Sequence, residues 1–119
     1  MLTTRQTKAA TIQRTITISQ EREPWGVTVY ASVFEQHHGK RTVKNISDVY
    51  VLVRHASDFG VYITAEKVVG ESDGEIYDVC LNQPGGGHSC TCKWGAYGSH
   101  KKNCRHVEAA LQAVREQKL

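Results

Sequence analysis

Three cysteines and one histidine lie close together in the C-terminal third of the chain. They form two short pairs separated by eleven residues: Cys90-Thr91-Cys92 and Cys104-Arg105-His106. Structural zinc sites take four tetrahedral ligands from cysteine and histidine. Three thiolates and one imidazole complete that set without a further residue. We therefore expect one structural Zn²⁺ ion, bound by Cys90, Cys92, Cys104 and His106.

The spacing within each pair indicates the backbone that each pair needs. In an extended chain, residues two apart point to the same side, so Cys90 and Cys92 can converge on one ion. In a helix, residues two apart lie roughly 200° apart around the axis and cannot both bind it. We therefore expect Cys104 at or before the N-cap of a helix, with His106 in the first turn. A thiolate at that position also lies near the positive end of the helix dipole.

Other cysteine and histidine residues leave alternatives to this ligand set. His88 and His100 are close enough in sequence to replace one ligand, and Cys80 precedes the first pair on a predicted strand. We interpret Cys80 as a small buried residue of that strand and the two histidines as neighbours of the site or as exposed residues. A metal-free cluster of buried or redox-active thiols is a further alternative. The remaining histidines have no partner pattern and are interpreted as surface residues: His37, His38 and His55.

The residues before the cysteine pairs predict an antiparallel sheet of about five strands. Short segments with alternating polarity, or rich in β-branched and aromatic residues, are separated by turn signals. These segments are 12–19, 27–34, 49–54, 60–65 and 75–81. The close spacing of the turns favours antiparallel pairing over parallel βαβ units. The polar segment 36–44 is expected to be a loop or a hairpin connection.

The C-terminal end has the periodicity of a helix. Four apolar residues there follow the i, i+3, i+4, i+7 pattern of one stripe: Val107, Ala110, Leu111 and Val114. Ala109 and Ala113 add helix propensity. The sequence thus predicts an α+β fold, in which an antiparallel sheet is followed by a zinc finger with one C-terminal helix.

Length and composition point to one ordinary globular domain, because the chain has 119 residues, of which 39% are hydrophobic and 23% charged. We expect a flexible tail over 1–11 and a single domain over 12–119, with the sheet in 12–81 and the finger and helix in 82–119. No apolar run approaches the roughly 20 residues of a membrane helix, so no membrane partner is expected. Without a visible secretory signal, we expect an intracellular protein, cytoplasmic or nuclear in a eukaryote, whose thiols stay reduced.

Charge is distributed unevenly along the chain. Residues 80–119 hold six basic and two acidic residues, whereas residues 21–79 hold six basic and ten acidic residues. A polyanion would therefore meet the C-terminal third or the N-terminal tail, which carries three basic residues and no acid in 1–20. The alternative is a solvated surface of scattered lysines.

The order of the ligand pairs resembles the SWIM zinc finger, in which a strand and C-x-C are followed by a variable loop, C-x-H and an apolar helix. The resemblance covers about residues 75–116, with the strand at 76–79 and the helix from Val107. It implies a ββα-like zinc unit that binds DNA or protein and is not known as a catalytic unit. Residues 1–70 match no such motif.

The segment between the two ligand pairs combines basic and aromatic residues. Basic groups contact phosphates, and aromatic rings stack on unpaired bases. We expect DNA binding through the loop 93–105, with contacts from Lys93, Trp94, Tyr97, Lys101, Lys102 and Arg105. Packing of the aromatic residues over the zinc site is the alternative to stacking. The alternative function is a protein–protein interaction module or a small subunit of a larger complex.

Catalysis and a small-molecule substrate find little support in the sequence. A closed Cys₃His site has no open coordination position for water or substrate. No Ser-His-Asp arrangement, phosphate-cradling loop or H-E-x-x-H motif occurs. We therefore expect a protein that is not an enzyme and takes no small-molecule substrate.

Overall fold

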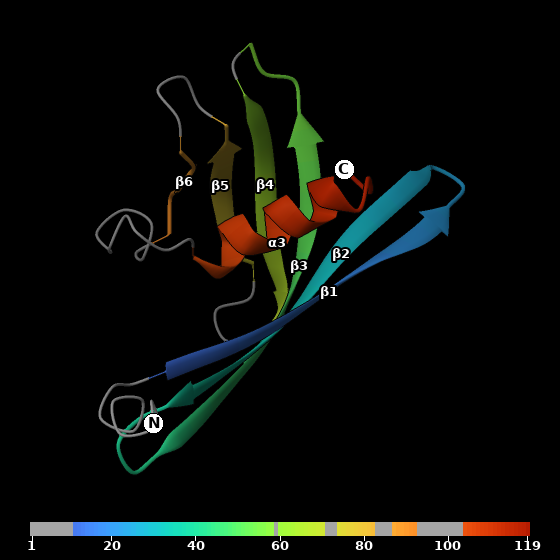
Figure 1. Ribbon diagram of the computed structural model, residues 1–119. Coiled ribbons are helices and arrows are strands. Elements are labelled where there is room, and N and C mark those ends of the chain that lie inside the picture. The colour runs from blue at the N-terminus through green and yellow to red at the C-terminus, as the bar shows by residue number, and fades with distance from the viewer. Residues whose placement is uncertain (1–10, 59, 71–73, 83–86, 93–103) are drawn as a thin grey trace.

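Six strands form one antiparallel sheet, and a helix packs against one of its faces (Figure 1). The computed structural model describes residues 11–58, 60–70, 74–82, 87–92 and 104–119. The strands are β1 (Thr11–Glu23), β2 (Gly26–His38), β3 (Val43–His55), β4 (Val61–Val69), β5 (Ile76–Leu81) and β6 (Ser89–Cys90), and the helix is α3 (Arg105–Arg115). The strands lie side by side in chain order. The predicted α+β fold is confirmed.

The strands differ from the prediction in length and in number. β1, β2 and β3 have 13 residues each, so they are longer than the apolar pattern indicates. Most of segment 36–44 is strand, and only residues 39–42 connect β2 to β3, closed by a 2.8 Å hydrogen bond from Gly39 N–H to the Thr42 carbonyl. A sixth strand, β6, pairs with β5 and brings Cys90 into the sheet. A strand of two residues is too short to show an alternating pattern in the sequence. β6 is therefore a strand only because it pairs with β5.

One face of the sheet, called the inner face here, lies against α3 (Figure 1). Alternate residues of β1 to β5 point to it and form most of the hydrophobic core. The buried apolar residues from the strands include Ile18, Val29, Ala31, Val33, Leu52, Ile63, Ala65, Val79 and Leu81. This alternation is the pattern that the sequence predicts for a half-buried sheet.

The helix α3 crosses the sheet with a face of small residues. Ala109, Ala110 and Ala113 are fully buried, whereas Leu111 and Val114 are only partly buried. The buried face is therefore rotated from the predicted stripe, because small side chains let the helix backbone lie close to the sheet. Near its C-terminal end, the Gln112 side chain donates a 2.8 Å hydrogen bond to the Ile16 carbonyl of β1. In the described part of the chain, no helix has the length and apolar character to cross a membrane.

Candidate metal centre

The four predicted ligands meet at the N-terminal end of α3. Their ligand atoms lie within 4.8 Å of one another, and all four residues are buried. His106 Nδ1 lies 3.6 Å from Cys90 Sγ and 3.7 Å from Cys104 Sγ. Tetrahedral zinc, with bonds of about 2.3 Å to sulfur and about 2.0 Å to nitrogen, separates such atoms by roughly 3.5 Å. The donor set and its spacing therefore fit one zinc ion.

The first ligand pair is held by the end of the sheet. Cys90 lies on β6, opposite Val79 of β5. Thr91, between the two cysteines, donates its backbone N–H to the Asp78 carbonyl at 3.0 Å. Its hydroxyl oxygen accepts the Asp78 backbone N–H at 2.9 Å. The sheet thus binds the middle residue of the pair through both its backbone and its hydroxyl group.

The second ligand pair spans the start of α3, as the spacing predicts. Cys104 is the N-cap residue, with extended backbone angles of φ −73° and ψ 172°. The helix begins at Arg105, so His106 lies in the first turn. The Cys104 carbonyl accepts the Glu108 N–H at 3.0 Å, which closes that turn. The two ligands can converge because only one of them has helical backbone.

The His106 ring is fixed by two tyrosines on the inner face. Tyr77 of β5 stacks on it, with ring centroids 4.1 Å apart and planes inclined by 24°. Tyr50 of β3 meets it edge to face, at 5.0 Å and 88°. The Tyr50 hydroxyl lies 3.2 Å from His106 Nε2, the nitrogen that faces away from the thiols. His106 therefore presents Nδ1 to the cluster in a single orientation.

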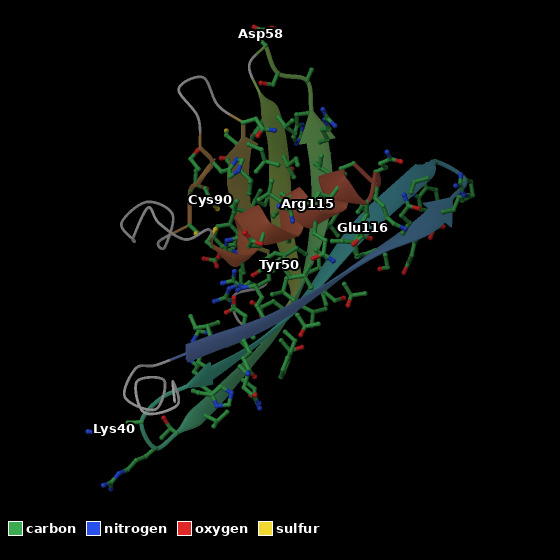
Figure 2. The ribbon with its side chains drawn as sticks, in the orientation of Figure 1. Lys40, Tyr50, Asp58, Cys90, Arg115 and Glu116 are labelled. Carbon is green, nitrogen blue, oxygen red and sulfur yellow. The ribbon has the colours of Figure 1, made fainter. Side chains whose placement is uncertain are left out.

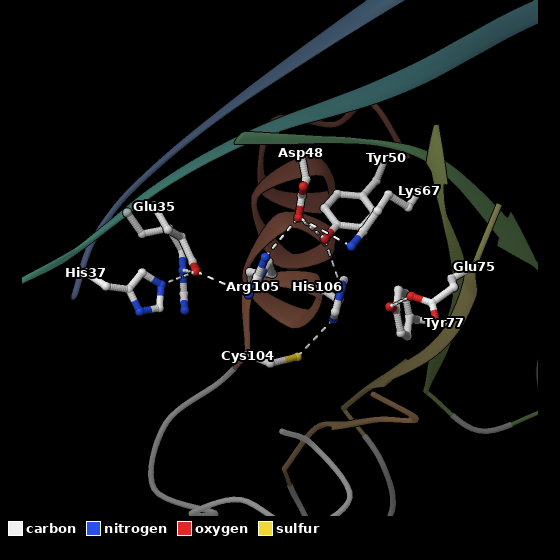
Figure 3. A network of polar contacts seen from close by, with 11 residues as sticks. Glu35, His37, Asp48, Tyr50, Lys67, Glu75, Tyr77, Cys104, Arg105 and His106 are labelled. Carbon is white, nitrogen blue, oxygen red and sulfur yellow. Dashed lines mark hydrogen bonds and ion pairs between the residues drawn. The ribbon is translucent and has the colours of Figure 1, made fainter. Parts of the chain in front are cut away.

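A buried network of charged side chains lies beneath the first turn of α3 (Figure 3). Arg105 donates to Asp48 Oδ2 at 2.9 Å, and its second terminal nitrogen lies 3.5 Å from Glu35 Oε1. Lys67 Nζ lies 3.6 Å from the same Asp48 oxygen. Glu35 also accepts from Arg14 at 2.6 Å. Each buried carboxylate is thus paired, which offsets the cost of its removal from water.

The surroundings of these groups shift several pKa values. Burial alone would raise the pKa of Glu35, but His37, Arg105 and Arg14 outweigh burial and lower it. A hydrogen bond from the Cys90 thiol is the largest cause that lowers the pKa of Cys104, to about 3, and the same bond raises the pKa of Cys90. Burial and the neighbouring Asp48 raise the pKa of Tyr50 far above its usual range. Tyr50 therefore keeps its proton at physiological pH.

Residues 83–115 match the SWIM zinc finger. The matched segment contains both ligand pairs and the whole of α3, so the resemblance predicted from the sequence is confirmed over a shorter range. The SWIM finger and its Cys₃His cluster are consistent with one structural Zn²⁺ ion. No curated protein and no solved structure gives a match to the chain.

The other predicted site residues fall in different places. Arg105 is described and is held by two carboxylates of the sheet. The other predicted nucleic-acid contacts lie outside the described residues: Lys93, Trp94, Tyr97, Lys101 and Lys102. His100 also lies outside them, whereas His88 accepts the Asn82 N–H through Nδ1 at 3.1 Å. Cys80 is half-buried on β5.

The three histidines outside the finger have side-chain partners. His37 Nε2 lies 2.9 Å from Glu35 Oε1, and His38 Nε2 lies 2.9 Å from Gln36 Oε1. His55 Nε2 lies 2.9 Å from the Thr64 hydroxyl oxygen. His37 thus belongs to the charged network, although no sequence pattern links it to Glu35.

Sequence reasoning missed the polar residues that support the centre. Glu35, Asp48 and Lys67 are buried on the inner face, with at most 9% of each residue exposed. Each continues the alternation of a strand at a position where an apolar residue is expected. In β2, for example, Val29, Ala31 and Val33 are followed by Glu35 on the same face. The sequence signal for these residues was a charged side chain at a strand position that the alternation assigns to the buried face.

Proposed function

We propose that this protein is a nucleic-acid-binding module whose SWIM finger contacts DNA through residues 93–105. One observation carries the proposal. The thiols of Cys92 and Cys104 belong to a cluster whose ligand atoms lie within 4.8 Å of one another. Cys92 and Cys104 are therefore close in space, and the residues between them in the sequence, 93–103, include three lysines and two aromatic residues. Such a composition suits phosphate contact and base stacking.

Arg105 takes a supporting part in this proposal. Its guanidinium is already bound by Asp48 and Glu35, so it has little capacity left for a phosphate. The phosphate contacts then belong to Lys93, Lys101 and Lys102. Trp94 and Tyr97 are the candidates for stacking on bases.

We propose that the zinc ion has a structural role and that the finger is not catalytic. Four protein ligands complete a tetrahedral zinc site, which leaves no position for water or substrate. All four ligands are also buried. None of the four cysteines, all within the described residues, forms a disulfide. Clustered thiols without disulfides suit the reducing interior of a cell, where we place this protein.

A salt-dependent binding measurement on two matched triple variants tests DNA binding. The loop variant carries Lys93→Glu, Lys101→Glu and Lys102→Glu. The control carries Lys40→Glu, Arg41→Glu and Lys44→Glu, three exposed residues at the β2–β3 connection. Both variants change the net charge equally, and Figure 2 shows Lys40 at the end of the sheet remote from Cys90.

The expected result separates local contact from net charge. Fluorescence anisotropy with a DNA oligonucleotide should show at least tenfold weaker binding for the loop variant than for the control. The slope of log affinity against log salt should also fall by up to about 3, one unit per lost phosphate contact. Equal losses in the two variants, or no binding by the native protein at low salt, would refute the proposal.

Protein–protein interaction is the second candidate, favoured by exposed apolar residues away from the finger. Trp25, in the β1–β2 turn, is 81% exposed. Phe34 and Val53, on the face opposite α3, are 42% and 46% exposed. A stoichiometric partner that survives nuclease treatment in a pull-down, and is lost in Phe34→Ser, would support this function. A protein that stays monomeric in the cell would count against it.

A further inference from the structure

The two tyrosines that contact His106 differ in where their hydroxyl groups point. Tyr77 stacks on the ring, but its hydroxyl donates to Glu75 Oε1 at 2.6 Å. The Tyr50 hydroxyl instead lies between His106 Nε2, at 3.2 Å, and Asp48 Oδ2, at 3.1 Å. Only Tyr50 therefore connects a ring nitrogen of the metal ligand to a carboxylate of the sheet (Figure 3).

The direction of the protons in this connection follows from the chemistry of its members. An ionised carboxylate only accepts hydrogen bonds, so Tyr50 must donate its single proton to Asp48. The Tyr50 oxygen is then an acceptor toward His106. A neutral imidazole has one N–H, and this contact places it on Nε2. Nδ1 is left with a lone pair, and Nδ1 is the atom that faces Cys90 and Cys104.

Asp48 is also an acceptor toward two cationic side chains. Arg105 and Lys67 both reach its Oδ2 atom, at 2.9 Å and 3.6 Å. Its other oxygen lies against Gly70, where an added Cβ would collide with it. Gly70 has φ +128°, a conformation that L side chains rarely adopt. The backbone therefore leaves room for the carboxylate, and two cations pair with it.

From these contacts we propose that Asp48 and Tyr50 are positioning residues for the zinc site: they set the His106 tautomer, with the proton on Nε2, and thereby raise zinc affinity. Arg105 contributes by tying the first turn of α3 to the same carboxylate. The β3 strand then acts on the metal through a histidine 56 residues away in sequence. Partners of the second ring nitrogen commonly change metal affinity by about 10- to 100-fold.

The first test uses the native protein and needs no variant. Long-range ¹H–¹⁵N correlation spectra of the zinc-loaded protein report which nitrogen of His106 carries the proton. The expected spectrum shows a protonated Nε2 and a metal-bound Nδ1. A metal-bound Nε2 with a protonated Nδ1 would overturn the proposal, whatever the variants below show.

The second test compares two substitutions that each remove one hydroxyl and keep the ring. Zinc affinity is measured by competition with a chelator of known affinity, for Tyr50→Phe and for the control Tyr77→Phe. Tyr50→Phe should bind zinc about 10- to 100-fold more weakly than the native protein, because Nε2–H loses its acceptor. Tyr77→Phe should stay within about twofold, because its stacking on His106 is retained.

Two results of this comparison would contradict the proposal. One is a zinc affinity of Tyr50→Phe within twofold of the native value. The other is an equal loss in both variants, which would show that tyrosine hydroxyls act only on stability. Spectra of zinc-loaded Tyr50→Phe give an independent check, since its His106 Nε2–H should exchange with solvent faster than in the native protein.

Discussion

The inner face of the sheet has two parts that meet α3 in different ways. One is an apolar part, where residues such as Leu52 and Ala65 share one hydrophobic core with Ala109 and Ala113. Under the first turn lies a polar part, where buried Glu35, Asp48 and Tyr50 contact Arg105 and His106, and Lys67 pairs with Asp48. Both parts are buried, but only the polar part is built from directional contacts.

The difference shows how one interface can stabilise a fold and orient a metal ligand. Hydrophobic burial is proportional to area and has no preferred direction, so it holds α3 on the sheet without fixing a side chain. Hydrogen bonds and ion pairs require defined distances and angles. The polar part therefore lies where Cys104 and His106 must be placed to within tenths of an ångström. We expect the two parts to respond differently to substitution.

Loss of the metal should have the largest effect, because a structural zinc ion contributes about 10–16 kcal/mol to folding. Cys104→Ser, or a strong chelator, should abolish the circular dichroism signal of α3. The sheet should also unfold more readily, because α3 covers its inner face. The matched control is Cys80→Ser, a half-buried residue of β5 outside the ligand set. A full helix signal without metal would refute a structural role for zinc.

In the apolar part, Leu52→Ala should lower the free energy of unfolding by about 2–5 kcal/mol. Leu52 is 2% exposed, so its loss leaves a cavity in the core of the inner face. Urea unfolding of the zinc-loaded protein measures the change. The neighbouring Val53→Ala, on the opposite face, should cost less than about 1 kcal/mol. Similar costs at the two positions would mean that the inner face is not the core.

In the polar part, Arg105→Met should lower the free energy of unfolding by about 3 kcal/mol, because it leaves buried carboxylates with fewer partners. This loss of stability is near the lower end of the usual range for a broken buried ion pair, because Arg14 still pairs with Glu35 and Lys67 still pairs with Asp48. Hydrogen exchange of the amides at residues 106–108 should become faster. Arg115→Met, an exposed site in the last turn of α3, should cost less than about 1 kcal/mol. Equal effects of both variants would contradict an anchoring role for Arg105.

The pH dependence of Glu35 should give the smallest effect. Its folded-state pKa lies below the ordinary value of 4.5, since His37, Arg105 and Arg14 outweigh the burial that would raise it. Ionised Glu35 therefore stabilises the fold above pH 4.5, and this stability is lost as pH falls through the folded pKa. Glu35→Gln should be less stable than the native protein at pH 7, with a difference that narrows below pH 4.5. A difference that stays constant as pH falls would contradict this role of Glu35.

Most of the fold was predictable because its signals are local. The alternation in Val27–Val33 and the run at Val49–Arg54 predict strands, since a half-buried strand repeats every two residues. Strand ends were less predictable, because pairing with a neighbour extends a strand beyond its apolar residues. β6 shows this most clearly, as Ser89 and Cys90 form a strand only against β5. The buried face of α3 differs from the predicted stripe for a similar reason. Contact with the sheet favours Ala109 and Ala113 over larger side chains.

The candidate metal ligands were predictable from the sequence alone, and the structure brings the four together. The pairs Cys90-Thr91-Cys92 and Cys104-Arg105-His106 provide three thiolates and one imidazole. The spacing of the second pair, with the apolar repeat that follows it, predicts where α3 begins. The tertiary structure decided how those ligands are held. It placed the Tyr50 hydroxyl next to Nε2 of His106, although these residues are separated by 56 positions in the chain. It also paired Arg105 with Asp48 across a separation of 57 positions. Such contacts leave no local pattern, because a hydrogen bond depends on which atoms the fold brings together.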